Sequence, residues 1–162
     1  MANYYTHLSF EMTLPSEPIA TAAAARMQAL DEALLAGVPD PAAVPKALHG
    51  FSGECAGVHV SAEGSTVWIH SDESAHVDLV AALVQQLLLE FDPRGCVAFE
   101  WSMGCSKPRV DGFGGGAAMV WSDDVKWDTT TRMLDRFRAE REVDEEEAAA
   151  ECEDETSATE AS

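Results

Sequence analysis

Three histidines of this chain stand where they could bind a metal ion or take part in acid–base chemistry. His7, His59 and His70 each fall on the polar side of a stretch that alternates apolar and polar residues, the pattern of a half-buried strand. On neighbouring strands they would share one sheet face with Trp68 and Glu11. Three imidazoles and a carboxylate suit a zinc-like ion. A polar outer face explains the same pattern, so a metal or small-ligand site is the alternative hypothesis.

A second group of chemically capable residues lies in the stretch "SKPRVDGFGGG", residues 106–116. Lys107 and Arg109 together with free glycine amides could hold an anion. The order fits neither a Walker loop, whose lysine follows the glycines, nor a dinucleotide fingerprint, which opens a helix. We therefore expect a glycine-permitted connection between two strands, with Lys107, Arg109, Asp111 and Phe113 exposed for contact with a partner.

The cysteines give little support for nucleophilic catalysis. They show no C-x-x-C spacing, and the N-terminus "MANYYTHLSF" lacks the pattern of a secretory signal, which predicts reduced thiols and a cytoplasmic protein. Cys105 with one of the histidines is the one tolerable nucleophile–base pair, and nothing in the sequence brings the two together. We expect no enzymatic activity and no cofactor.

The elements that must position these residues follow from periodicity. Alternation predicts strands at residues 4–14, 96–102 and 117–122 and a hairpin at 58–70, whose turn near Glu63-Gly64 would place His59 opposite Trp68. Helical spacing predicts helices at 16–37, from Ser74 to Asp92, and from Ser122 or Asp123 onward. Asp123 and Asp124 are expected to cap the last helix, whose apolar residues would close the core.

This order predicts an α+β fold. The first six elements match a ferredoxin-like βαββαβ unit, an antiparallel sheet with both helices on one face. A fifth strand and a C-terminal helix would extend it, and a rearranged α+β sandwich is the alternative. We expect one domain over residues 1–138, followed by an acidic, disordered tail over residues 139–162.

The net charge of −19 is divided between tail and body. Residues 139–162 hold eleven acids against one base, and residues 1–138 hold eighteen acids against nine bases. Such a balance argues against direct binding to nucleic acid, which needs clustered lysine and arginine. It favours a basic protein partner, with solubility as the simpler explanation. No apolar run approaches the roughly 20 residues that span a bilayer, so no membrane partner is expected.

Several short motifs of the chain resemble those of one family. Glu100-Trp101-Ser102, Cys105 to Arg109, Phe113 with the glycine triplet, and Lys126-Trp127 are similar to a family of small proteins from phages, plasmids and related mobile elements. The opening "NYYTHLSF" is similar to the start of that family. The resemblance covers residues 99–127 and the first residues. It implies an accessory protein of a mobile element and assigns no catalytic residue.

Charge and resemblance together favour a binding protein. The leading hypothesis is a non-enzymatic module that inhibits a nucleic-acid-handling host defence protein, as anti-CRISPR and anti-restriction proteins do, by occupying a basic groove with carboxylates. The residues expected to bind the partner are Lys107, Arg109, Asp111, Phe113, Asp123 and Asp124. A third hypothesis is that the protein is a structural or regulatory domain whose partner is unknown.

Overall fold

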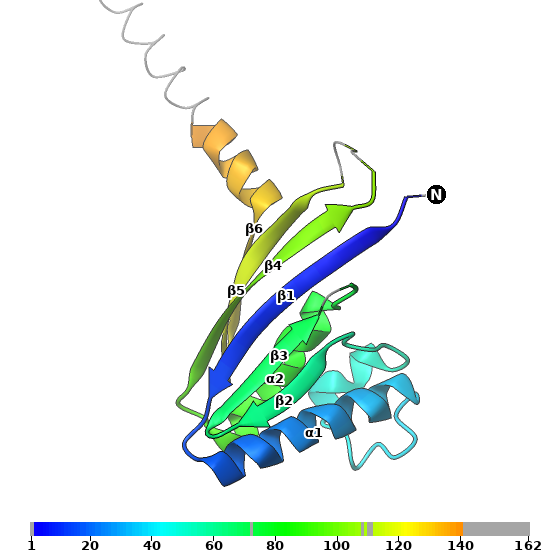
Figure 1. Ribbon diagram of the computed structural model, residues 1–162, viewed down its shortest axis with the longest axis vertical. Coiled ribbons are helices and arrows are strands. Elements are labelled where there is room, and N and C mark those ends of the chain that lie inside the picture. Colours follow the sequence, from blue (N-terminus) through cyan, green and yellow to red (C-terminus); the bar gives the residue numbers. More distant parts are fainter. Residues whose placement is uncertain (1, 72, 108, 110–111, 141–162) are drawn as a thin grey trace, which may run out of the picture. The chain divides into compact units, whose positions relative to one another are not determined.

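The computed structural model describes residues 2–140 except 72, 108, 110 and 111 (Figure 1). Its elements are β1 (Tyr4–Thr13), α1 (Glu17–Leu35), a 3-10 helix η1 (Lys46–Phe51), β2 (His59–Glu63), β3 (Thr66–Ser71), α2 (Val77–Phe91), β4 (Cys96–Cys105), β5 (Gly114–Trp121) and β6 (Val125–Thr129). Residues 130–140 form a further helix. The predicted α+β class is confirmed.

The strands form one antiparallel sheet with the order β2-β3-β1-β4-β5-β6. β1 lies between β3 and β4 and pairs antiparallel with both, so the N-terminal strand is central (Figure 1). α1 contacts β2 and β3, α2 contacts β4 and β5, and the two helices contact each other. Helices therefore pack along the four strands on either side of β1.

The core lies between these helices and one face of the sheet. Leu8, Phe10 and Met12 of β1 are buried, whereas the residues between them are not, as strict alternation predicts. The helices contribute buried stripes at helical spacing: Ala20, Ala23, Ala24, Met27, Leu30 and Leu34 from α1, and Leu79, Val80, Ala81, Leu83, Val84, Leu87 and Leu88 from α2. The alternation of β1 thus leaves the opposite sheet face without a covering layer of core side chains.

The outer edge of β2 is occupied by a side chain of α1. Gln28 Nε2 donates a hydrogen bond of 3.0 Å to the carbonyl oxygen of Val60. β2 is also short, at five residues. Both features are ways of protecting an edge strand from pairing with other chains.

The region after β5 differs from the prediction. A helix was expected from Ser122 or Asp123, but residues 125–129 form β6, the sixth strand. Trp121 N donates to the carbonyl oxygen of Asp124 at 2.9 Å, which closes a tight turn between β5 and β6. Trp127 then packs edge-on against Trp101, with ring centroids 5.8 Å apart. Aromatic packing in a sheet therefore prevails over local helical signals here.

The start of α2 also differs in detail. Ser74 was expected to cap this helix, but the capping residue is His76, whose Nδ1 accepts from the backbone N–H of Leu79 at 3.2 Å. The ring of His76 also meets Phe51 edge-on, with centroids 5.8 Å apart. The contact with η1 thus places His76 at the capping position, where serine is the more usual residue.

The glycine triplet lies inside β5 and not in a loop. A side chain at Gly115, which has a φ of 155°, would overlap the carbonyl oxygen of Trp101. A side chain at Gly116 would overlap both the ring of Trp101 and the carbonyl oxygen of Asp128. The triplet thus lets β4 and β6 lie close on either side of β5, so these glycines serve packing and do not form an anion-binding cradle.

The chain divides into two compact units after Asp128. In the second unit the structure describes residues 129–140. Three apolar residues of its helix were expected to close the core but are exposed, namely Met133 at 36%, Leu134 at 50% and Phe137 at 50%. Residues 139 and 140, predicted to belong to a disordered tail, are helical, and the rest of that tail lies outside the described residues.

Candidate functional site: the open sheet face

The open face is the side of the sheet opposite the core, and it carries polar and aromatic side chains. We define it by these residues: Tyr5, His7, Ser9 and Glu11 of β1; His59, Ser61 and Glu63 of β2; Thr66, Trp68 and His70 of β3; and Glu100 and Ser102 of β4. They share a face because each occupies the alternate position to a core-facing residue of its strand.

Within β1 to β4, the full charges of the open face have a single sign. β1 to β4 contain three carboxylates, Glu11, Glu63 and Glu100, and no lysine or arginine. All three are exposed. A cationic side chain that approaches these strands therefore meets only attractive full charges within them.

Trp68 is the most prominent side chain of this face. It is 45% exposed although it is a tryptophan at the middle of a strand. One side of its indole ring stacks on His70, with centroids 4.0 Å apart and planes 25° apart. Its Nε1 donates to Ser9 Oγ at 2.9 Å. Stacking and hydrogen bond together fix the orientation of an exposed ring, which lowers the entropy cost of using it for binding.

A small hollow of about 270 Å³ adjoins Trp68. It is lined by Glu11, Ser61, Glu63, Thr66 and Trp68, and we call it the Trp68 hollow. His70 does not line it, so the hollow lies on the side of the indole ring that is not stacked. Glu11 and Ser61 are the direct cross-strand partners of Trp68.

Sequence reasoning placed Glu11 and Trp68 on this face but missed Ser61, Glu63 and Thr66 as their neighbours. The signal that identifies them is the hairpin register. The turn is at Gly64-Ser65 and not at Glu63-Gly64, so the strands pair with His59 opposite His70. The prediction that His59 lies opposite Trp68 is therefore wrong, because moving a two-residue turn by one position moves every partner by two.

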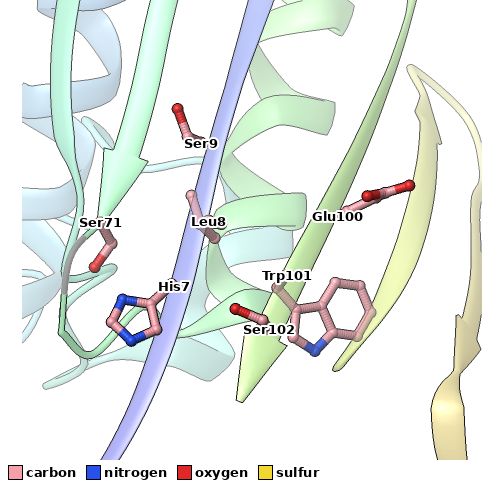
Figure 2. A pocket seen from close by; sticks show the side chains of 7 residues that line it. All are labelled: His7, Leu8, Ser9, Ser71, Glu100, Trp101 and Ser102. Atoms are coloured by element: carbon pink, nitrogen blue, oxygen red, sulfur yellow. The ribbon is translucent and has the colours of Figure 1, made fainter. Parts of the chain in front are cut away.

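A second hollow, of about 410 Å³, lies along β1 and β4. Figure 2 shows the imidazole of His7 and the hydroxyl of Ser102, which are direct cross-strand partners, near one another, with Glu100 farther along β4. Histidine beside serine is the composition of a nucleophile–base pair, which needs a hydrogen bond of about 2.6–3.2 Å. His7 and Ser102, both described, make no hydrogen bond to each other, so the geometry gives no support for such a pair.

The three histidines do share the open face, as predicted. His59 and His70 are neighbours with ring centroids 5.3 Å apart, whereas His7 stacks on Tyr5 at 6.1 Å. Among the residues that the structure describes, no three His, Cys, Asp or Glu side chains gather closely enough to hold a metal ion. The alternative hypothesis of a metal site at His7, His59 and His70 thus gains no support from the arrangement.

The predicted partner-binding residues do not form one cluster. Lys107, Arg109 and Phe113 are exposed in the connection that precedes β5, and Asp111 lies outside the described residues. Phe113 is 62% exposed.

Asp123 and Asp124 lie in the turn that follows β5, at the other end of an eight-residue strand. Such a strand is about 25 Å long. Neither aspartate caps a helix, because the turn leads into β6. Asp124 instead accepts the backbone N–H of Val125 at 2.8 Å.

The described cysteines lie apart from the Trp68 hollow. Cys55, Cys96 and Cys105 are free thiols, and Cys152 lies outside the described residues. Cys55 Sγ lies 3.6 Å from Asp31 Oδ2, a hydrogen bond that holds the thiol beside α1. Within the described residues, no helix has the length and apolar character that a membrane crossing requires.

Comparisons with known proteins give no match to a family model, to a curated protein or to a solved structure. The resemblance to proteins of mobile elements therefore stays a prediction. The site consists of an exposed, fixed aromatic ring with flanking carboxylates, on strands that contain no lysine or arginine.

Proposed function

We propose that this protein is a non-enzymatic binding module that attaches to a basic protein through its open face. The observation that carries the proposal is the charge of the four strands β1 to β4. They expose three glutamates, two of which line the hollow beside a fixed tryptophan, and contain no lysine or arginine. The rigid sheet presents these groups without a large ordering cost on binding.

We further infer that the first six elements belong to the ferredoxin-like class. The strand order β2-β3-β1-β4 with antiparallel pairing supports this assignment. In such a unit both helices pack on one side, which leaves the other side available for a partner. β5 and β6 then extend the sheet beyond the unit.

The partner class that we propose is a nucleic-acid-handling protein. Its surface carries lysine and arginine where phosphates bind, and carboxylates fixed on a sheet are complementary to that surface. A protein bound over this basic surface would inhibit the partner, as expected of an accessory protein from a mobile element. Exposed Lys107, Arg109 and Phe113 supply a second, smaller contact at the end of the sheet in this proposal.

The first test immobilises the full chain and identifies the proteins that it captures, at low salt and at about 0.5 M salt. At the higher concentration, charge interactions are screened within a few ångströms. A variant with Glu11→Gln, Glu63→Gln and Glu100→Gln is compared with the unaltered chain. We expect the captured protein to be a basic nucleic-acid-binding protein, to be released by salt, and to associate about tenfold more slowly with the variant.

The matched control removes three exposed carboxylates elsewhere, through Glu17→Gln, Glu32→Gln and Glu73→Gln. This variant has the same net charge as the open-face variant. If both variants lose binding equally, net charge is responsible and the open face is not the site. Binding that survives high salt in both variants would contradict the electrostatic proposal altogether.

A further inference from the structure

We propose that the Trp68 hollow is a receptor for one arginine side chain of the partner, and that it prefers arginine over lysine. This inference rests on the proposed function, since it names the group by which a basic partner is recognised. The occupant of the open face is then an arginine-bearing segment of the partner. Three features favour it, namely the indole ring, the two carboxylates and the hollow that they line.

The indole ring supplies a flat surface for a cation. His70 covers one side of the Trp68 ring, and the hollow adjoins the other side. A guanidinium stacked on tryptophan within about 6 Å of the ring centre is attracted by the ring electrons. The hydrogen bond from Nε1 to Ser9 Oγ keeps the ring in the required orientation before the partner arrives.

Two carboxylates flank this stacking position. Glu11 is the direct partner of Trp68 on β1. Glu63 lies on β2 opposite Thr66, which is the next pair on the same face. Direct partners have Cβ atoms about 5 Å apart, and diagonal neighbours about 7–8 Å. A guanidinium over the ring can therefore donate hydrogen bonds toward carboxylates from two directions.

Arginine fits this arrangement better than lysine does. Its planar group stacks on an aromatic ring while its five N–H donors point outward in the plane, where carboxylates can accept pairs of them. An ammonium group is a compact, strongly hydrated point charge and gains less from the ring. The hydroxyls of Ser61 and Thr66 complete a polar lining.

The hollow is large enough to receive one long side chain. Its volume of about 270 Å³ lies near the lower end of the roughly 300–1,000 Å³ usual for small-molecule sites. Its position on a sheet face that is exposed within residues 4–128 suits a residue presented by another protein surface. Charge complementarity selects a cationic residue, because the strands around the hollow contain glutamates and no lysine or arginine.

The test measures binding of the full chain to two synthetic peptides by calorimetry, one alternating arginine with glycine and the other alternating lysine with glycine. The two peptides carry equal charge, and the acidic C-terminal residues are common to every variant. We expect the arginine peptide to bind about five- to tenfold more tightly, as ring stacking and paired hydrogen bonds predict.

Substitutions test which residues cause the preference for arginine over lysine. Trp68→Leu should reduce the preference for arginine to less than about twofold, whereas Trp68→Phe, which keeps an aromatic ring, should retain part of it. The double variant Glu11→Gln with Glu63→Gln should also reduce the preference for arginine, and it leaves the ring in place. The test therefore holds even if Trp68→Leu fails to fold. Glu32→Gln is the control, since Glu32 is exposed on α1 and does not line the hollow. It should leave the preference unchanged.

The outcomes separate this inference from the proposed function. Equal binding of both peptides, or a preference that survives Trp68→Leu, overturns the arginine receptor while leaving an acidic binding face. If the unaltered chain binds neither peptide and no basic protein at low salt, both proposals are overturned together. An arginine preference lost on substitution of Trp68 or of the two glutamates, but not of Glu32, supports the receptor.

Discussion

At the scale of single residues, Gly116 shows how sequence and packing are linked. It is the direct partner of Trp101 on β4, and the ring of Trp101 occupies the space where a side chain would stand. The carbonyl oxygen of Asp128 on β6 closes the site from the other strand. Two neighbours therefore leave no space for a side chain at this position.

We predict that Gly116→Ala destabilises the protein by about 2–3 kcal/mol, because the added methyl group overlaps the backbone as well as a ring. Gly104→Ala in β4 is the control, since a side chain there meets no atom within 4 Å. It should be neutral or stabilise by up to about 0.5 kcal/mol, as glycine is unfavourable inside a strand. Urea unfolding of the two variants measures the difference, and similar values for both would contradict this account of the triplet.

Residue patterns predicted much of the open face but not its internal geometry. Alternation in β1 and in the hairpin placed His7, His59 and His70 on one side correctly. Register depends on which two residues form the turn, and the sequence "AEGST" allows more than one choice. The neighbours of Trp68, and hence the hollow, therefore become visible only in the folded chain.

At the scale of elements, α1 and α2 are joined by a paired ion contact. Arg26 Nε lies 3.1 Å from Glu90 Oε2, and its Nη2 lies 3.2 Å from Oε1. The two side chains are 31% and 28% exposed, so solvent screens the pair only in part. Gln86 Nε2 also donates to Glu90 at 2.7 Å and fixes the carboxylate.

A double-mutant cycle with Arg26→Met and Glu90→Gln should give a coupling of about 0.5–1 kcal/mol, the upper part of the range for exposed pairs, because both N–H groups are used. The coupling should fall as salt is raised. Chemical unfolding of the four variants at two salt concentrations provides the values. A coupling near zero at low salt would show that the contact does not hold the helices together.

Element prediction succeeded for the long patterns and for the β2–β3 hairpin, and it failed at β6. α1, α2 and β1 each extend over ten or more residues with one clear period. β6 has five residues, and the aspartates before it resemble a helix cap. The helix after it begins at residue 130. Its strand conformation depends on Trp127 packing with Trp101, a contact between residues distant in sequence.

At the scale of the whole molecule, the buried core and the open face both lie within residues 4–128. A chain ending at Glu140 loses ten acids and one base, so its net charge changes from −19 to −10. We predict that its melting temperature stays within about 2 °C of the full chain, because no core residue is removed. A thermal scan monitored by circular dichroism checks this.

The same shortened chain should keep its preference for the arginine peptide and bind both peptides more slowly at low salt. Preference arises from the Trp68 hollow, whereas long-range attraction scales with total charge. Stopped-flow association rates at two salt concentrations separate these contributions. If the shortened chain loses the preference, recognition depends on residues 141–162 and not on the open face.

The protected edge of β2 also limits how copies of this protein can associate. Gln28 occupies an edge carbonyl of β2, whereas β6 ends the sheet on the other side in the described part of the chain. A new strand at the β2 edge would compete with Gln28 for that carbonyl, so pairing between molecules is less favourable there than at an edge whose carbonyls are unoccupied. A single glutamine thus works against head-to-tail stacking of sheets, which needs both edges of every molecule.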